Sequence, residues 1–173
     1  MKLAIAAILA LVVLQRLVEL VYAERNTRAL LARGAVEVGR SHYPLIVALH
    51  VLWLMAIVVL LPADATINCI ALTLFVLLQI GRVWVIVTLG PYWTTRIITL
   101  PGAPLVRSGL YRFVRHPNYV IVGGEIAILP LVFGEIAVSV VFTALNAGLL
   151  FWRIRQEDAA LAVRRAGGSA KLG

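Results

Sequence analysis

The sequence is poor in cysteine and in charged residues. Cys69 is the one cysteine among 173 residues, which excludes an intrachain disulfide and a metal site built from several cysteines. Only 14% of the residues are charged, whereas roughly a quarter are charged in a typical soluble domain. A chain of this length has too little interior to bury the 62% of its residues that are hydrophobic. We therefore expect much of its surface to face lipid.

Acidic residues are also scarce, with 8 Asp and Glu against 16 Lys and Arg and a net charge of +8. Such a balance can indicate a nucleic-acid partner, but the basic residues do not form one stripe. They collect between apolar runs, in segments 24–42 and 90–117 and in the C-terminal tail. This distribution is typical of the cytoplasmic segments of membrane proteins. We expect the lipid bilayer, and no nucleic acid, as a partner.

Apolar runs of nearly membrane-spanning length predict the fold class, an all-α integral membrane protein with about five transmembrane helices. Pro62 and the sequence GPYW at 90–93 stop two of these helices, and a tight turn at Gly134 and Glu135 separates the last two. The predicted helices cover residues 2–23, 43–61, 66–89, 118–133 and 136–156.

Grouping these helices divides the chain into three parts. We expect an N-terminal transmembrane helix pair over 1–65 and a core over 66–163, followed by a polar tail over 164–173. The core would hold the third helix, a long loop over 90–117 and a helical hairpin over 118–156. A loop of that length within a compact domain is often functional.

With five helices, the basic segments all fall on one side of the membrane, which should be the cytoplasm. The interpretation is a multi-pass protein of the bacterial inner (cytoplasmic) membrane, with its N-terminus outside and a cofactor pocket on the cytoplasmic side. Several ionisable residues then lie at a similar depth, roughly 5–12 Å below the cytoplasmic surface. They are Arg16, Glu19, His50, Arg82 and Glu125. Such groups are costly in a bilayer unless they face a cavity or one another. Arg82 and Glu125 could therefore bind substrate or form an ion pair.

Two motifs mark helix ends beside the cytoplasm. In RHPNY, Pro117 suits the first turn of a helix and places His116 at its entry, where backbone N–H groups favour an anion. In RIRQEDAAL, Arg153 and Glu157 are four residues apart and share a helix face. With Tyr119, these groups could hold a zwitterionic ligand. The simpler alternative is that these motifs bind no ligand. RHPNY would then only begin a helix, and RIRQED would end one whose long basic side chains extend to water.

The two motifs together carry a resemblance. The stretch LVRSGLYRFVRHPNY, followed some 35 residues later by RIRQEDAAL, resembles the isoprenylcysteine carboxyl methyltransferase family of integral membrane enzymes over about residues 80–163. The first half, through ERN…LLARGAVEVGRSHYPLIVALH, is similar to a bacterial branch of that family, some of whose members are associated with O-methylation of alkylpyrones. Ile121 stands where the family often has glycine, and Asp158 where it often has a second glutamate.

The resemblance implies S-adenosylmethionine as cofactor and no metal. It places the cofactor against Leu105, Val106, Tyr111, His116, Pro117, Asn118, Tyr119 and Glu157. It also implies that Arg153 contacts the methyl acceptor, which makes Arg153 and Glu157 the predicted catalytic residues. We add Arg82 and Glu125 to Arg153 as candidate substrate-binding residues because of their position in the helices.

The predicted function is an S-adenosylmethionine-dependent O-methyltransferase that acts on a carboxylate or an enol or phenol oxygen of a lipophilic acceptor, of prenylcysteine or alkylpyrone type. A nicotinamide-dependent membrane reductase of a lipid and a phospholipid N-methyltransferase are alternatives. A small non-enzymatic membrane transporter is a third, although the outer halves of the predicted helices hold no ionisable residue that would continue a path.

Overall fold

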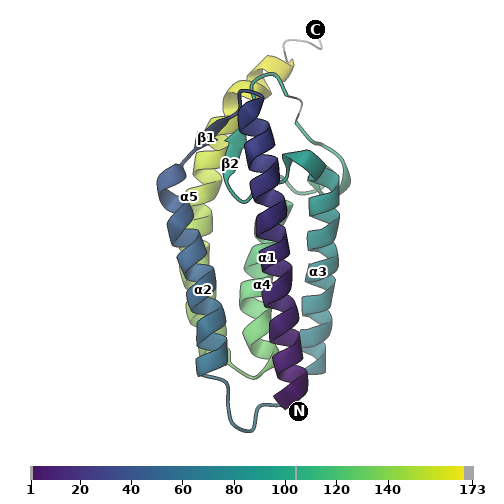
Figure 1. Ribbon diagram of the computed structural model, residues 1–173, viewed down its shortest axis with the longest axis vertical. Helices are drawn as coiled ribbons and strands as arrows, with labels where there is room; N and C mark the ends of the chain where they lie inside the picture. Colours follow the sequence, from purple (N-terminus) through teal and green to yellow (C-terminus); the bar gives the residue numbers. More distant parts are fainter. Residues whose placement is uncertain (1, 104, 170–173) are drawn as a thin grey trace.

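A computed structural model describes residues 2–103 and 105–169, and these form a bundle of helices standing along one long axis (Figure 1). The described helices are α1 (Lys2–Ala32), α2 (Tyr43–Val59), α3 (Cys69–Leu89), α4 (Pro117–Val132) and α5 (Ile136–Ser169). The N-terminus lies at one end of the bundle, and the last turns of α5 lie at the other (Figure 1). Both long connections, from α1 to α2 and from α3 to α4, lie at the end where α5 finishes.

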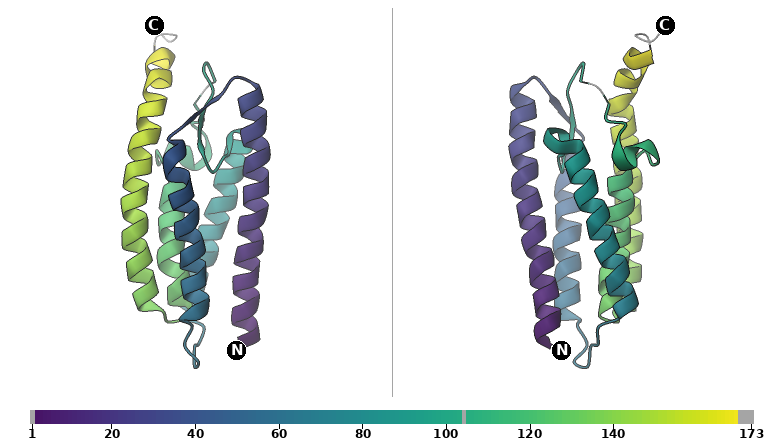
Figure 2. Two further views of the ribbon diagram at one scale, coloured as in Figure 1. Left: turned by 60° about the vertical axis from the view of Figure 1, so that its left-hand side comes forward. Right: turned by 90° about the vertical axis from the view of Figure 1, so that its right-hand side faces the viewer.

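A small sheet joins these two long connections. Strand β1 (Val36–Val38) pairs antiparallel with β2 (Ile97–Thr99), so that Val36 lies opposite Thr99. The sequence predicts helices alone; the fold is mostly helical, and this two-stranded sheet is an addition to that prediction. Three-residue strands are too short for an alternating pattern to reveal them. We call the end of the bundle that carries this sheet the ribbon end. Figure 2 shows the 90–116 segment there, between the ends of α1 and α5.

Helix boundaries differ from the predicted ones for local reasons. The first helix runs to Ala32 rather than to residue 23, because Thr27 and Leu30 in its polar extension are buried against the protein. The third begins at Cys69 rather than 66, where the Asn68 side chain accepts hydrogen bonds from the N–H groups of Ile70 and Ala71. The fifth continues through Ser169. Part of the predicted polar tail is therefore helical, and residues 170–173 lie outside the described residues.

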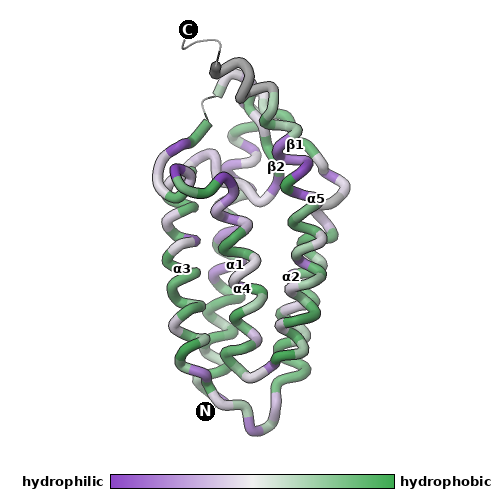
Figure 3. Tube along the Cα trace, turned by 180° about the vertical axis from the view of Figure 1, so that it is seen from behind, coloured by the Kyte–Doolittle hydropathy of each residue, from purple (hydrophilic) through white to green (hydrophobic). Residues whose placement is uncertain are grey.

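Three described helices are long and apolar enough to cross a membrane, namely Lys2–Ala32, Cys69–Tyr92 and Ile136–Ala162. The helices Tyr43–Val59 and Pro117–Val132 are apolar but shorter, and 17 residues of α2 span only about 26 Å. Large apolar side chains such as Leu11, Val58 and Ile80 are exposed. Figure 3 shows hydrophobic residues along most of the bundle's length, with hydrophilic ones gathered at the ribbon end.

The helices pack as one bundle. A large apolar cluster around Trp53, Ile57 and Phe133 fills the half nearer the N-terminus, and a smaller one contains Val85, Trp93 and Ile121. Ile121, at a position where glycine is frequent in the resembled family, packs against Gly81 of α3: a Cβ there would come within 3.3 Å of Ile121 Cδ1. The glycine on α3 therefore provides the space that this isoleucine needs. Helix α2 also contacts α5, so the predicted N-terminal pair and core share one packed unit.

Candidate active site

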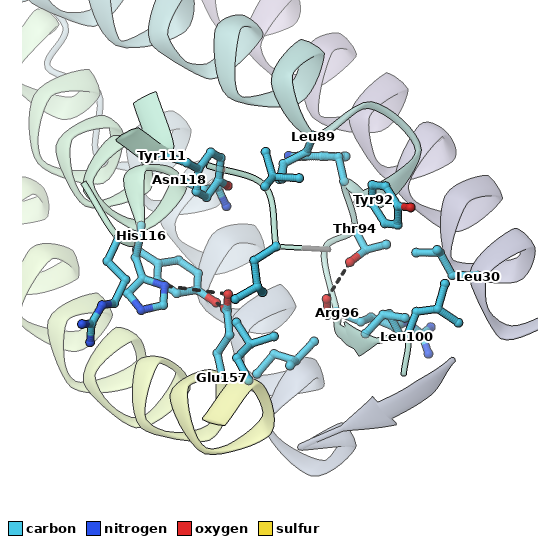
Figure 4. Close-up of a pocket in the computed structure, with 18 of the residues that line it drawn as sticks. Leu30, Leu89, Tyr92, Thr94, Arg96, Leu100, Tyr111, His116, Asn118 and Glu157 are labelled. Carbon is cyan, nitrogen blue, oxygen red and sulfur yellow. Dashed lines mark hydrogen bonds and ion pairs between the residues drawn. The ribbon is translucent and has the colours of Figure 1, made fainter. Parts of the chain in front are cut away.

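A cavity of about 420 Å³ opens at the ribbon end. Its lining comes from the last residue of α3 and the segment after it, from Tyr111 of η3 (Gly109–Arg112), from the start of α4 and from the second half of α5, with Leu30 added by the extension of α1. Figure 4 shows Tyr111, Asn118, His116 and Glu157 on one side, and Leu30, Tyr92, Thr94, Arg96 and Leu100 on the other. We call the first the polar side. The second combines apolar side chains with Thr94 and Arg96.

The polar side is built where α4 begins. His116 is the N-cap residue of α4 and Pro117 its first helical residue, so the proline fixes the direction in which the chain enters the helix. Tyr119 follows within the first turn and stacks on the His116 ring, with the ring centroids 5.4 Å apart. Pro117 is buried and does not line the cavity. Its contribution is to orient the two side chains that do.

The second half of α5 closes this side through a continuous chain of polar contacts. Arg153 donates from Nη2 to the Thr95 carbonyl at 2.6 Å and from Nε to the Tyr119 hydroxyl at 2.9 Å. The Tyr119 hydroxyl in turn donates to the Glu157 carboxylate. The other oxygen of Glu157 lies 3.7 Å from His116 Nδ1, while His116 Nε2 lies 3.2 Å from Asp158 Oδ1. The RHPNY and RIRQED motifs are thus joined side chain to side chain.

The opposite wall is held by the N-terminal part of the chain. Asn26, on the extension of α1, donates to the carbonyls of Gly90 at 3.1 Å and Trp93 at 2.8 Å. Arg96 pairs with Glu37 of β1 at 3.3 Å and lies over the ring of Tyr43. These contacts hold the segment that follows α3, residues 90–96, in one conformation. The first 43 residues therefore shape the cavity even though most of its polar groups come from the second half.

Two buried polar atoms on the cavity lining have no hydrogen-bond partner among the described residues. They are Asn118 Oδ1, an acceptor, and Trp93 Nε1, a donor. Leaving such atoms unpaired costs about 1–3 kcal/mol each, which a ligand with a matching donor and acceptor would recover. Burial and the nearby Glu157 carboxylate raise the pKa of Tyr111 above its ordinary value, so its phenol stays protonated and can also donate.

Arg82 and Glu125 lie elsewhere, outside the lining of this cavity. They are part of an ion-pair network with Arg16 and Glu19, formed by residues of α1, α3 and α4. Arg16 lies 2.9 Å from Glu19 and 2.8 Å from Glu125, and Arg82 Nη1 lies 3.2 Å from Glu19. Arg82 also donates to both oxygens of Glu125, from Nε at 2.7 Å and from Nη2. The expected pairing of Arg82 with Glu125 is confirmed, as part of a network with equal numbers of positive and negative side chains.

The geometry brings most of the predicted cofactor residues to one place. Besides Arg153, those that line the cavity are Leu105, Val106, Tyr111, His116, Asn118, Tyr119 and Glu157. Lining residues that the sequence did not predict include Leu30, Trp93, Arg96 and Leu100. The one available signal was GPYW at 90–93, which we interpreted only as a helix stop. Among residues 2–103 and 105–169, no group of three or more His, Cys, Asp or Glu is placed to hold a metal ion.

The chain belongs to the isoprenylcysteine carboxyl methyltransferase (ICMT) family, whose model matches residues 69–163. That match covers α3, the 90–116 segment, α4 and most of α5, which together supply nearly all of the cavity lining. Membership of this family implies a membrane methyltransferase, and the long apolar helices agree with a lipid environment.

Two relatives are similar over most of their length. The chain is 38% identical to "Uncharacterized protein YpbQ" of Bacillus subtilis (strain 168) over 160 residues, which cover 89% of this chain and 94% of that protein. It is 30% identical to an "Uncharacterized protein" of Haemophilus influenzae over 149 residues, which cover 79% of this chain and 83% of the relative. No solved structure matches the chain.

Proposed function

We propose that the protein is an S-adenosylmethionine-dependent O-methyltransferase of the cytoplasmic membrane, acting on a carboxylate or an enol or phenol oxygen of a lipid-like molecule. The observation that carries this proposal is the chain of contacts from Arg153 through Tyr119 and Glu157 to His116, in a cavity whose opposite side includes the apolar side chains of Leu30 and Leu100. A site of this kind suits one water-soluble ligand and one lipophilic ligand.

The polar side fits the donor chemically. S-adenosylmethionine carries a cationic sulfonium and ammonium, a carboxylate, ribose hydroxyls and an adenine, and it supplies the methyl group when bound. Glu157 is a carboxylate suited to a cationic or hydroxyl group. Asn118 Oδ1 and Trp93 Nε1 provide an unpaired acceptor and an unpaired donor. Tyr111 also lines the cavity and offers an aromatic ring, and aromatic faces attract cations.

Arg153 is proposed to hold the acceptor oxygen. Its guanidinium is buried and fixed at two points by the Thr95 carbonyl and the Tyr119 hydroxyl. A pre-oriented guanidinium suits a carboxylate or enolate, because its N–H groups form a rigid fork. Such an acceptor is already an anion, so the chain's tasks are to orient it and to exclude water. Tyr119 and Thr95 act as positioning groups that keep Arg153 in place.

The apolar part of the lining is proposed to take the acceptor's hydrocarbon tail. Its residues include Leu30, Leu89, Ile98, Leu100 and Leu161. Alkylpyrone-type and prenylcysteine-type acceptors both carry a polar oxygen at one end of a long apolar chain, and both match this division. Arg82 and Glu125 satisfy one another in the ion-pair network, so we no longer propose that they bind substrate directly.

Incubation of the purified protein with methyl-labelled S-adenosylmethionine and bacterial lipid extract tests this proposal. We expect mass spectrometry to find a labelled lipid whose methyl group is removed by alkaline hydrolysis, as for an ester, or retained, as for an enol or phenol ether. The apolar lining and Arg153 are the reasons for this expectation. Labelling only of lipid amines would instead indicate an N-methyltransferase, and an absence of label with oxidation of a nicotinamide cofactor would indicate a reductase.

We also propose that all five helices cross the membrane, with the ribbon end in the cytoplasm. The basic residues of the long connections lie at this end, as the positive-inside rule requires. Cys69 is exposed at the first residue of α3, near the opposite end, and gives a native probe. In intact spheroplasts, a membrane-impermeant maleimide is expected to label Cys69. In a Cys69→Ser background, Ser108→Cys is expected to react only after lysis.

A crossing by the three longest helices alone predicts the opposite pattern. Residues 33–68 would then share one side of the membrane with the start of α3, and the 90–116 segment would lie outside. Reaction of Ser108→Cys in intact spheroplasts, with Cys69 protected until lysis, would therefore contradict the five-helix arrangement.

A further inference from the structure

A basic surface lies at the edge of the active-site cavity, and its residues Arg112, Phe113 and Val114 have no part in the proposed reaction. Segment 107–115 exposes Arg107, Arg112 and Arg115 together with two apolar side chains, Phe113 and Val114. Phe113 is 77% exposed and Val114 41%, and adjacent exposed apolar side chains rimmed by polar residues mark sites of contact with a membrane or a partner. We call this segment the 107–115 surface.

The position of the 107–115 surface is fixed by close contact with α3. Gly109 has a φ of +57°, and a Cβ on it would come within 2.6 Å of Thr88 Oγ1 and 3.1 Å of Trp84 Nε1. The backbone here therefore lies directly against the last turns of α3. On the same turns, Trp84 is 50% exposed and Val87 is 72% exposed. Phe113 and Val114 thus extend the lipid-facing surface at the level where a spanning helix ends.

The charges on this surface are unpaired. Among the described residues, no carboxylate lies within ion-pair distance of Arg107, Arg112 or Arg115, in contrast to Arg96, which pairs with Glu37. The guanidinium of Arg112 lies 5.9 Å from the centre of the Phe113 ring. The three arginines surround a shallow depression of about 480 Å³, which Tyr111, Phe113 and Val114 also line.

We propose that this depression binds the headgroup of an anionic phospholipid of the surrounding bilayer. Guanidinium groups bind phosphate oxygens in bidentate fashion, and arginines at the cytoplasmic surface are attracted by anionic lipids. The exposed Phe113 and Val114 point to a lipid rather than a soluble phosphate, because a headgroup held by the arginines brings acyl chains beside these apolar side chains. A free phosphate would leave both of them in water.

The depression and the active-site cavity share Arg107, Tyr111 and Arg115, whereas Arg112 and Phe113 line the depression alone. Variants at these last two positions therefore separate lipid binding from the methyl-transfer site. Lipid binding can also be measured without any methyl donor, so its failure and the failure of the proposed activity are distinguishable.

Native mass spectrometry of the full-length protein in detergent tests the proposal, with phosphatidylglycerol and phosphatidylcholine of identical acyl chains. We expect preferential retention of phosphatidylglycerol. Arg112→Gln should lower its affinity by about fivefold, from one basic contact with an anionic lipid, and leave phosphatidylcholine binding unchanged. Phe113→Ser should weaken both lipids. Arg33→Gln removes an exposed arginine at the end of α1 and is the matched control, with no expected effect.

Three results would overturn the proposal. Equal retention of the two lipids would show that charge is not recognised. An equal loss in Arg33→Gln and Arg112→Gln would show attraction to the net charge rather than to this surface. Displacement of phosphatidylglycerol by excess inorganic phosphate would show that the site accepts any phosphate. The melting temperature of each variant tests whether it is folded. We expect little change, because Arg33, Arg112 and Phe113 are all exposed.

Discussion

Replacing Glu125 with methionine is expected to lower the free energy of unfolding by about 3–5 kcal/mol, the usual loss when one partner of a buried ion pair is removed. Glu125 is almost fully buried and contacts Arg82 at both carboxylate oxygens and Arg16 at one. Without it, two guanidinium groups would share one remaining carboxylate, that of Glu19. An uncompensated charge at this depth has no water to stabilise it.

The double variant Arg82→Met with Glu125→Met is expected to lose less stability than the sum of the two single losses, because it removes one charge of each sign. Arg16 and Glu19 then remain as a balanced pair at 2.9 Å. A double-mutant cycle in detergent measures this coupling. Arg28→Met breaks the exposed pair with Glu24 and should cost at most about 1 kcal/mol. Additive losses across the cycle would show that Arg82 and Glu125 do not stabilise one another.

The sequence was sufficient to predict the start of α4 and the shared helix face of Arg153 and Glu157, which meet at the polar side of the cavity. A proline after His116 and the four-residue spacing of Arg153 and Glu157 are local signals, because each depends on the geometry of a single helix. The similar depth of Arg16, Glu19, Arg82 and Glu125 in the bundle was also predictable, since the rise per residue of a helix sets that depth. These features needed no knowledge of how distant segments pack.

The remaining wall of the cavity could not be predicted in this way. The positions of Trp93 and Arg96 depend on two contacts between distant segments. Asn26 donates hydrogen bonds to the carbonyls of Gly90 and Trp93, which are 64 and 67 residues later in the chain, and β1 pairs with β2. Neither contact has a periodic signal, and the strands are only three residues long. The extension of α1 was missed for a related reason. Its polar residues resemble a loop until burial of Thr27 and Leu30 against the protein is known.

Glu157→Gln is expected to weaken S-adenosylmethionine binding roughly ten- to a hundredfold, since a hydrogen bond to a charged group is worth about 1.5–3 kcal/mol. The substitution preserves the shape of the side chain and an oxygen that can accept from Tyr119. It removes the negative charge that faces the cavity and is proposed to hold the donor. Arg153 stays in contact with the Tyr119 hydroxyl and the Thr95 carbonyl, so its position should change little.

Asp158→Asn is the matched control for this variant. It removes the same charge one residue away, from a side chain that contacts His116 but does not line the cavity. If Glu157 acts only through the general field of negative charge, the two variants should weaken the donor equally. A direct contact predicts a much smaller loss in Asp158→Asn.

Calorimetric titration of S-adenosylmethionine into the full-length protein in detergent, with the Glu157→Gln and Asp158→Asn variants alongside, tests most directly whether this cavity is a methyl-donor site. The account predicts saturable binding to the unaltered protein, a ten- to hundredfold loss in Glu157→Gln, near-normal binding in Asp158→Asn, and no heat from NADPH. Saturable binding of NADPH with no response to S-adenosylmethionine, or donor binding that is the same in all three proteins, would contradict it.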